Sequence, residues 1–223
     1  SKLNEKPKFI IINASNDEGN ARYIKGKIRE GERAGLNVEV VKFEEDCCNQ
    51  DVLNIITKCN KEKIPVILQL PTFKHLDTKS LMESINYGVD ADGFAREWIG
   101  EINLGNDKKI APATPKGVIS LLEYHNVDVQ GKVALVIGKS NHVGKPLCSM
   151  LMNRGATLIN ANSKTRDLSE LVRMSDIIIS CVGQQNLIKS EDIKENAVLI
   201  GVGFTYVNGK QILDFDVEEV VNL

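Results

Sequence analysis

The chain has 223 residues, of which 42% are hydrophobic and 26% charged, as expected for a globular protein with one large core or two small ones. Its formal net charge of −2 creates no overall field for nucleic acid or an anionic membrane, so we expect neither as a partner. No apolar run approaches membrane-spanning length and the first residues do not form a secretory signal, which predicts a cytoplasmic protein.

The cysteine and histidine patterns argue against structural cross-links. The five cysteines include no C-x-x-C pair, and the three histidines have no metal-ligand spacing. An odd cysteine count does not suit a disulfide framework, so we expect reduced thiols and no metal ion.

The first half of the chain alternates between apolar runs and amphipathic segments. Strands are predicted at 8–13, 38–43 and 65–70, and helices at 20–34, 51–59 and 80–85. This alternation predicts a first α/β domain, residues 1–114. The polar segment 107–115 ends it, and Thr114 and Pro115 predict the N-cap and first residue of a helix over 116–125.

The second half alternates in the same way. Strands are predicted at 133–137, 157–161, 176–181 and 197–202, and helices at 145–153 and 168–174. Such a pattern predicts a parallel sheet with right-handed crossovers, here a Rossmann-like doubly wound domain over 115–223. The Asn-Gly pair within 207–210 predicts that the last strands form an antiparallel hairpin.

A glycine turn follows the first strand of this second domain. The segment Gly138-Lys-Ser-Asn-His-Val-Gly-Lys-Pro146 has the order strand, tight turn and helix start, in which backbone N–H groups face the phosphates of a dinucleotide. Ser140 occupies the second glycine position of the usual G-x-G-x-x-G, so the spacing alone is a weak fingerprint.

The residues after the next strand bear on the choice of cofactor. Asn162-Ser-Lys-Thr165 stands where a Rossmann domain meets the adenosine ribose and where an acidic residue favours NAD. Ser163, Lys164 and Lys139 instead offer donors and positive charge, which favours NADP. A polar turn with a surface lysine is the alternative.

Three polar groups in the first half could carry chemistry. Tyr23 and Lys27 are four residues apart on one predicted helix face, where Lys27 could donate a proton or stabilise charge. The spacing alone favours a solvated basic face, because Lys25 and Arg29 flank the pair. Gln69 ends an apolar strand, where it could contact a ligand or cap the strand.

Two carboxylates precede a glycine in Asp90-Ala-Asp-Gly-Phe94. A D-G dipeptide is first of all a turn. On an extended segment Asp90 and Asp92 would face the same side, and one of them could accept hydrogen bonds from amino or ring N–H groups of a substrate.

These segments, in order and at similar spacing, resemble the bifunctional methylenetetrahydrofolate dehydrogenase/methenyltetrahydrofolate cyclohydrolase family, known in bacteria as FolD. The likeness covers almost the whole chain. Further segments that carry it are Tyr23-Ile-Lys-Gly-Lys27, Gln69-Leu-Pro71, Pro112-Ala-Thr-Pro-Lys-Gly117, Asn208-Gly-Lys210 and Asp214-Phe-Asp216.

The resemblance implies two α/β domains with a folate and cofactor cleft between them. It implies oxidation of 5,10-methylenetetrahydrofolate with NADP, then hydrolysis of the methenyl product to 10-formyltetrahydrofolate. Lys27, Gln69 and Asp92 match catalytic positions, and Tyr23, Gln69 and Asp92 match substrate-binding ones. Tetrahydrofolate derivatives are the implied substrates, and a homodimer the implied assembly.

The resemblance also implies NADP as cofactor, with NAD as the alternative. The implied cofactor-binding residues are Gly138, Lys139, Ser140, Val143, Gly144, Ser163 and Gly183. Lys139 stands where the family often has arginine, which keeps the charge but loses the bidentate fork.

The sequence departs from the family pattern at both ends. A long helix usually precedes the first strand, and a glycine- and proline-rich loop that lines both pockets usually precedes a last helix; neither is in this sequence. Two alternatives therefore stay open, namely a cyclohydrolase with little or no dehydrogenase activity and a catalytically silent folate- or nucleotide-binding relative.

Overall fold

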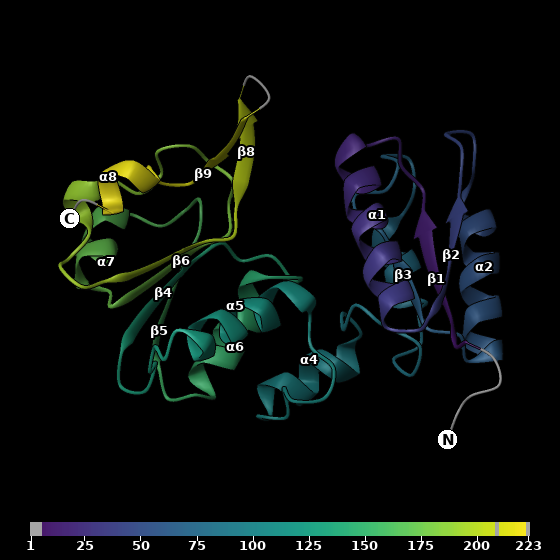
Figure 1. Ribbon diagram of the computed structural model, residues 1–223, viewed down its shortest axis with the longest axis horizontal. Helices are drawn as coiled ribbons and strands as arrows, with labels where there is room; N and C mark the ends of the chain where they lie inside the picture. Colours follow the sequence, from purple (N-terminus) through teal and green to yellow (C-terminus); the bar gives the residue numbers. More distant parts are fainter. Residues whose placement is uncertain (1–5, 208–209, 222–223) are drawn as a thin grey trace. The chain divides into compact units, whose positions relative to one another are not determined.

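The computed structural model describes residues 6–207 and 210–221, which divide between Trp98 and Ile99 into two compact units (Figure 1). Each unit is a parallel sheet with helices on its faces, as the sequence predicts. The domain limits 1–114 and 115–223 stay predictions. Within the described residues, no helix combines the length and apolar character that crossing a membrane requires.

The first unit is built on a three-stranded parallel sheet of order β2-β1-β3. Its strands are β1 (Lys8–Asn13), β2 (Asn37–Lys42) and β3 (Val66–Leu68). Since β1 is central and its two neighbours are reached in opposite directions, the carboxyl end of β1 is the point where α/β sheets bind ligands.

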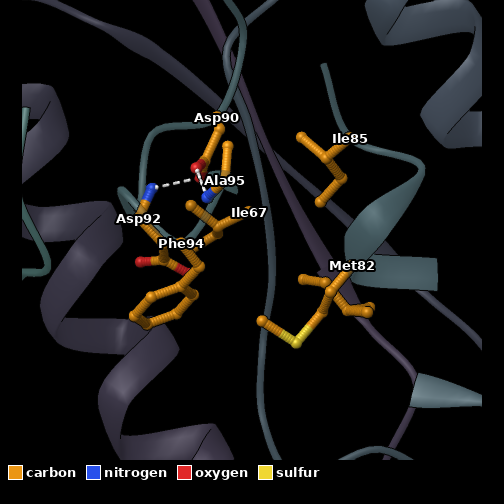
Figure 2. A pocket seen from close by; sticks show the side chains of 8 residues that line it. Ile67, Met82, Ile85, Asp90, Asp92, Phe94 and Ala95 are labelled. Atoms are coloured by element: carbon orange, nitrogen blue, oxygen red, sulfur yellow. Dashed lines mark hydrogen bonds between the residues drawn. The ribbon is translucent and has the colours of Figure 1, made fainter. Parts of the chain in front are cut away.

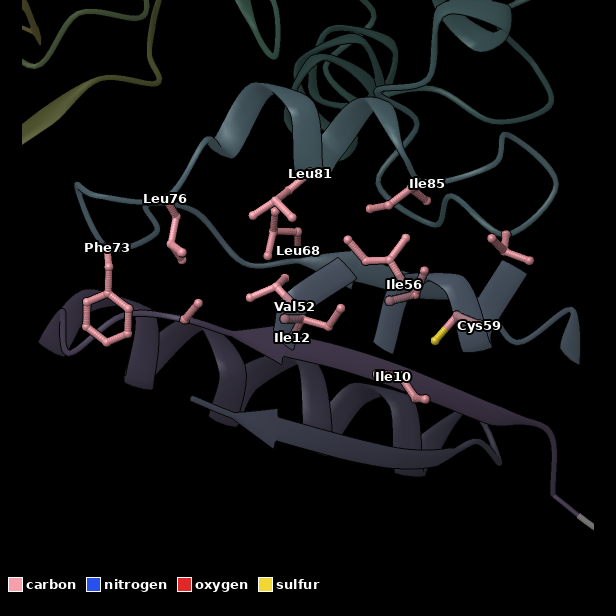
Figure 3. Close-up of a cluster of buried hydrophobic side chains, with 13 residues drawn as sticks. Ile10, Ile12, Val52, Ile56, Cys59, Leu68, Phe73, Leu76, Leu81 and Ile85 are labelled. Carbon is pink, nitrogen blue, oxygen red and sulfur yellow. The ribbon is translucent and has the colours of Figure 1, made fainter. Parts of the chain in front are cut away.

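Helices cover both faces of this sheet, which explains why β1 and β3 are almost continuously apolar. Ile11 and Ile67 pack with Ile24 of α1 (Glu18–Arg33) on one face. On the other face, Figure 3 shows Ile10 and Ile12 of β1 beside the apolar side chains of α2 (Asn49–Glu62) and α3 (Thr78–Glu83).

The start of α1 is fixed by its N-cap. The Asp17 carboxylate accepts a hydrogen bond from the backbone N–H of Asn20 at 2.9 Å, which satisfies one of the free donors of the first turn. This cap sets the helical phase that places Lys27 over the carboxyl edge of the sheet.

The second unit contains a four-stranded parallel sheet of order β5-β4-β6-β7. Its strands are β4 (Val133–Ile137), β5 (Thr157–Ala161), β6 (Ile177–Ser180) and β7 (Val198–Gly201). α5 (Ala113–Tyr124) and α6 (Gly144–Met152) pack on one face, and α7 (Leu168–Met174) packs on the other. The predicted doubly wound sheet is confirmed.

The predicted hairpin is confirmed as well. β8 (Phe204–Val207) and β9 (Lys210–Leu213) pair antiparallel, although the turn residues 208–209 lie outside the described residues. The elements that the sequence analysis missed are short, namely α4 (Arg96–Asn103), the 3₁₀ turn η1 (Ser190–Asp192) and α8 (Val217–Val221).

The predicted cap of α5 is wrong by two residues. The helix begins at Ala113 with Pro112 at the N-cap, and the N–H of Lys116 already donates to Pro112 O at 3.1 Å. Pro115 therefore sits at the third helical position rather than the first. The first turn tolerates it because N–H groups there have no helical acceptor.

Candidate active site

Lys27 is the centre of a polar cluster at the carboxyl edge of the first sheet. Its Nζ donates to Gln69 Oε1 at 3.1 Å and lies 3.7 Å from Asp92 Oδ1. The Lys27 side chain is 36% exposed and that of Asp92 is 19% exposed, so the pair is only partly solvated. The fold thus brings together the three residues that the sequence analysis assigned to catalysis.

Gln69 is held in one orientation. Its side chain is buried, and its Nε2 donates to Leu70 O at 3.1 Å. This bond leaves Oε1 directed at Lys27. One end of its amide therefore bonds the backbone at the end of the strand, as the capping interpretation predicts, and the other end contacts Lys27; contact with a ligand stays a prediction.

The two aspartates have different surroundings (Figure 2). The buried carboxylate of Asp90 accepts hydrogen bonds from the N–H groups of Asp92 and Gly93, both at 3.0 Å, and of Ala95 at 2.7 Å. Asp90 is thus the turn-forming carboxylate. Asp92 is the one that faces Lys27.

The surroundings of Asp92 raise the pKa of its carboxyl. Burial raises the pKa of the Asp92 carboxyl, and the charge of Asp90 raises it further, while the charge of Lys27 and a hydrogen bond from it oppose both effects. An adjoining pocket supplies apolar surroundings. Its lining consists of Ile67, Leu68, Met82, Ile85, Asp90, Asp92, Phe94 and Ala95.

Tyr23 lies one helical turn before Lys27 and is 54% exposed. Lys25 and Arg29 on the same helix are also exposed. The interpretation as a solvated basic face fits those two residues, whereas Lys27 points to Gln69 and Asp92. The structure leaves the Tyr23 ring accessible to a ligand.

The glycine turn of the second unit is fixed by close backbone contacts. Gly138 has φ +122, a conformation open mainly to glycine, and a Cβ on Gly144 would lie 2.2 Å from Gly138 O. The helix α6 can therefore approach the end of β4 only with glycine at 144.

Ser140 takes over a role at the start of α6. Its Oγ accepts from the N–H groups of Val143 at 3.1 Å and Gly144 at 3.3 Å. The serine thus occupies donors that the glycine fingerprint would offer to a phosphate. Lys139 and Lys145 are exposed beside this turn.

The neighbouring strand end lies at the same edge. Ile137 of β4 pairs in parallel with Ala161 of β5, so the segment that follows β5 emerges beside Gly138. The side chain of Asn160 ties the two together, because its Nδ2 donates to Val136 O at 2.9 Å and Gly138 O at 2.8 Å. Ser163 is exposed there.

The loop after β6 carries Gly183 and is held by a buried carboxylate. Asp214 accepts from the hydroxyl of Ser180, from Val182 N at 3.2 Å and from Gln184 N at 2.6 Å. Gly203 packs so closely that a Cβ there would lie 2.3 Å from Gly183 N. The sequence does not indicate this role of Asp214, because nothing in its local pattern shows which distant N–H groups the carboxylate would meet.

No metal site is evident in the described part of the chain, since residues 6–207 and 210–221 contain no group of three His, Cys, Asp or Glu side chains placed to hold an ion.

Two family models match the chain. Residues 1–92 match the catalytic domain of tetrahydrofolate dehydrogenase/cyclohydrolase. Residues 112–223 match the NAD(P)-binding domain of the same enzymes. The first match contains the Lys27 cluster, and the second contains the glycine turn.

Individual relatives agree. The bifunctional protein FolD of Lactobacillus acidophilus is 37% identical over 216 residues, which cover 96% of this chain and 76% of that protein. FolD of Clostridium novyi is 36% identical over 222 residues, covering 98% of this chain and 80% of its own.

Solved structures agree too. FolD methylenetetrahydrofolate dehydrogenase/cyclohydrolase of Campylobacter jejuni superposes with a TM-score of 0.93 at 33% identity, covering 98% of this chain and 78% of that one. The Trypanosoma brucei enzyme, solved with NADP cofactor and an inhibitor, has a TM-score of 0.90 at 25% identity and covers 97% of this chain and 77% of its own. The chain belongs to the tetrahydrofolate dehydrogenase/cyclohydrolase family.

Proposed function

We propose that this protein oxidises 5,10-methylenetetrahydrofolate to 5,10-methenyltetrahydrofolate with NADP and hydrolyses the methenyl product to 10-formyltetrahydrofolate. The observation that carries the proposal is the Lys27–Gln69–Asp92 cluster, in which one ammonium lies 3.1 Å from an amide oxygen and 3.7 Å from a carboxylate. The match of both halves of the chain to domains of these enzymes supports it.

Lys27 is the group that handles protons in the hydrolysis. An ammonium has three N–H donors; Gln69 accepts one and Asp92 lies beside another, which leaves the third for the substrate. Water adds to the methenyl carbon, the bond from that carbon to N5 breaks, N5 keeps one proton of the water, and the other proton leaves. Lys27 assists as a donor, through the third N–H of its ammonium, to the groups that exchange these protons.

Asp92 and Tyr23 bind the folate. A carboxyl with a raised pKa can accept from ring N–H groups when ionised and donate when protonated, and the exposed Tyr23 ring offers a face for stacking. Gln69, fixed through Leu70 O, keeps the Lys27 ammonium in place while the substrate binds.

The second unit fits an NADP-type cofactor. Glycine at 138 and 144 lets α6 begin close to the end of β4, an arrangement in which a helix N-terminus can face a phosphate. Lys139 and Ser163 stand exposed at the edge where β4 and β5 end. No acidic residue occurs in 162–165 to repel a ribose phosphate. Bound there, NADP would accept a hydride from the methylene bridge.

Gly183 completes the proposed set of cofactor contacts, together with Ser140 and Val143. Its loop is pre-formed by the bonds from Val182 and Gln184 to Asp214. A loop ordered before the cofactor arrives loses little conformational entropy on binding.

We further propose that the protein is a homodimer, which the resemblance to the family implies, and that it lies in the cytoplasm, which its odd number of cysteines without a C-x-x-C pair favours. Sedimentation equilibrium tests the assembly, because a dimer has twice the 24.7 kDa of the chain. A monomer at micromolar concentration would contradict this part of the proposal.

Two assays separate the candidate activities. Methylenetetrahydrofolate is supplied with NADP⁺ or NAD⁺ and methenyl formation is followed by absorbance; methenyltetrahydrofolate is then supplied alone and its loss is followed. We expect both reactions, with NADP⁺ preferred. Hydrolysis without oxidation would leave a cyclohydrolase, and no turnover with folate still bound would leave a silent binder.

The Lys27→Met variant tests the assigned residue. We expect it to lose hydrolysis by about 100-fold or more, as for removal of a general acid–base group, while tetrahydrofolate binding stays within a few-fold. Lys25→Met is the matched control, because Lys25 is exposed on the same helix and its loss should leave hydrolysis unchanged. Unaltered hydrolysis in Lys27→Met would refute the role.

A further inference from the structure

Asp90 makes an unusual set of hydrogen bonds next to the proposed active site. Its Oδ1 accepts from the N–H groups of Asp92 and Gly93, both at 3.0 Å, and its Oδ2 accepts from the N–H of Ala95 at 2.7 Å. The residue is only 6% exposed. One buried carboxylate thus accepts from the backbone of three residues, and these donors are the N–H of Asp92 itself and those of two residues that follow it.

Asp90 is itself tied to the sheet. It forms an isolated parallel bridge with Val66 of β3, in which Val66 N donates to Val89 O at 2.8 Å and Ala91 N donates to Val66 O at 3.3 Å. The sheet therefore fixes the backbone of Asp90, and the Asp90 carboxylate in turn holds the loop that follows. The same strand leads directly into Gln69, the other acceptor for Lys27.

The conformation that Asp90 holds is one the loop would not keep alone. Gly93 has φ +75, so the chain reverses tightly just after Asp92, and the Gly93 N–H would be without an acceptor if Asp90 were removed. The Lys27–Asp92 separation is 3.7 Å, near the outer limit of an ion pair. A displacement of the loop by about 1 Å would break this contact.

We propose that Asp90 is a positioning residue for the active site: its carboxylate holds the turn that presents the Asp92 side chain to Lys27. This inference rests on the proposed function of the Lys27 cluster. It divides the two neighbouring aspartates into one that contacts the substrate and one that acts only through the other.

The charge of Asp90 has a second effect on Asp92. It adds to burial in raising the pKa of the Asp92 carboxyl, against the opposing charge of Lys27 from α1. The remaining groups around Asp92 in this pocket, such as Ile67, Met82 and Phe94, are apolar. Removal of the Asp90 charge should therefore shift the ionisation of Asp92 to lower pH.

Asp90→Asn is the sharpest test. The amide keeps one oxygen acceptor, but in place of Oδ2 it presents an NH₂ group to the N–H of Ala95, so one bond is lost and two donors face each other. Asp77→Asn is the matched control. Asp77 is an exposed carboxylate that caps α3 by accepting from Ser80 N at 3.1 Å and Ser80 Oγ at 2.6 Å, away from Lys27.

The experiment is a double-mutant cycle with Asp90→Asn, Asp92→Asn and the double variant. We measure cyclohydrolase kcat/KM against pH, below the onset of thermal unfolding of every variant. We expect Asp90→Asn to lower kcat/KM about 10- to 100-fold, because small misplacements of catalytic groups have effects of this size. The double variant should be no worse than Asp92→Asn, since the two residues act as one unit.

The pH profile gives a signature that loss of stability alone would not. The acidic limb that Asp92 controls should move to lower pH in Asp90→Asn and stay in place in Asp77→Asn. The proposal would be overturned if the double variant lost kcat/KM by the product of the two single losses, or if Asp90→Asn had the kcat/KM of the wild type.

Binding separates a failure of this inference from a failure of the proposed function. The same cycle is run on the affinity for tetrahydrofolate, measured by calorimetry. An inactive wild type would refute the proposed function. Even then, positioning of Asp92 by Asp90 would be supported if Asp90→Asn weakens tetrahydrofolate binding and the double variant binds no more weakly than Asp92→Asn. Equal affinity of Asp90→Asn and wild type would refute it.

Discussion

The contact between Gly144 and Gly138 offers a direct test of the glycine turn. A Cβ added at Gly144 would lie 2.2 Å from Gly138 O, 2.7 Å from Gly138 C and 3.1 Å from Lys139 Cα. All three are backbone atoms, so no side-chain rotation relieves the overlap. In Gly144→Ala, either α6 or the end of β4 must move.

The size of the effect follows from that overlap. An ordinary carbon–oxygen contact is about 1 Å longer, and overpacking of this kind costs about 1–3 kcal/mol. For a unit of this size about 1 kcal/mol lowers Tm by roughly 4 °C, so we expect a fall of about 4–12 °C. The loop from Gly138 to Val143 also shifts, and the loss of one hydrogen bond to a phosphate weakens NADP binding about tenfold.

Differential scanning calorimetry measures the first effect and isothermal titration with NADP measures the second. Gly100→Ala is the control: Gly100 lies within α4, a Cβ there meets nothing within 4 Å, and alanine should stabilise the helix by about 0.5–1 kcal/mol. If Gly144→Ala had the Tm and NADP affinity of the wild type, the assignment of Gly144 to a required close contact would be refuted.

Three further predictions concern charge and thiols. Burial raises the pKa of Asp92, so the folded protein holds the proton of this carboxyl more tightly than the unfolded chain does. The contribution of Asp92 to stability is therefore full below its unfolded pKa and is lost as pH rises through the folded pKa. Asp92→Asn should therefore raise Tm at pH 7 but not at pH 3, and an equal effect at both would contradict this. Burial raises the pKa of the Cys181 thiol to about 12. Iodoacetamide at pH 8 should therefore label the exposed Cys48 well before Cys181, as read by mass spectrometry. Labelling of both thiols at the same rate would contradict this prediction. Arg154→Met should lower the free energy of unfolding, measured in denaturant, by about 3 kcal/mol, because it leaves the buried carboxylate of Asp107 without its partner. Adding Asp107→Asn should restore much of the lost stability. No restoration would contradict the assigned pairing.

Much of the fold follows from local pattern. The strands Lys8–Asn13, Val133–Ile137 and Thr157–Ala161 begin and end where the apolar runs predict, since parallel strands covered on both faces must be continuously apolar. Helix α4 was missed because it is short and only Ile102 is buried in it, too few apolar positions to show a helical period.

The site divides along the same line. Local pattern raises Lys27 and Gln69 as candidates only, and it does not show which aspartate meets Lys27; the resemblance to the family is what indicates Lys27 and Asp92. The directions of the two carboxylates depend on the hydrogen bonds that Asp90 accepts from three backbone N–H groups. Without those bonds, on an extended segment, both carboxylates would face the same side. Long-range acceptors such as Asp214 give no local signal.

Asp214 also bears on the order in which the protein is made. The loop that carries Gly183 leaves the ribosome before Asp214 does, and until then the hydroxyl of Ser180 and the N–H groups of Val182 and Gln184 have no carboxylate to meet. During synthesis these groups gain their acceptor only after β8 and β9 have been made, because Asp214 directly follows β9. A nascent chain arrested before Asp214 should hence bind NADP poorly even with its parallel sheet formed, so cofactor affinity should arise among the last steps of translation.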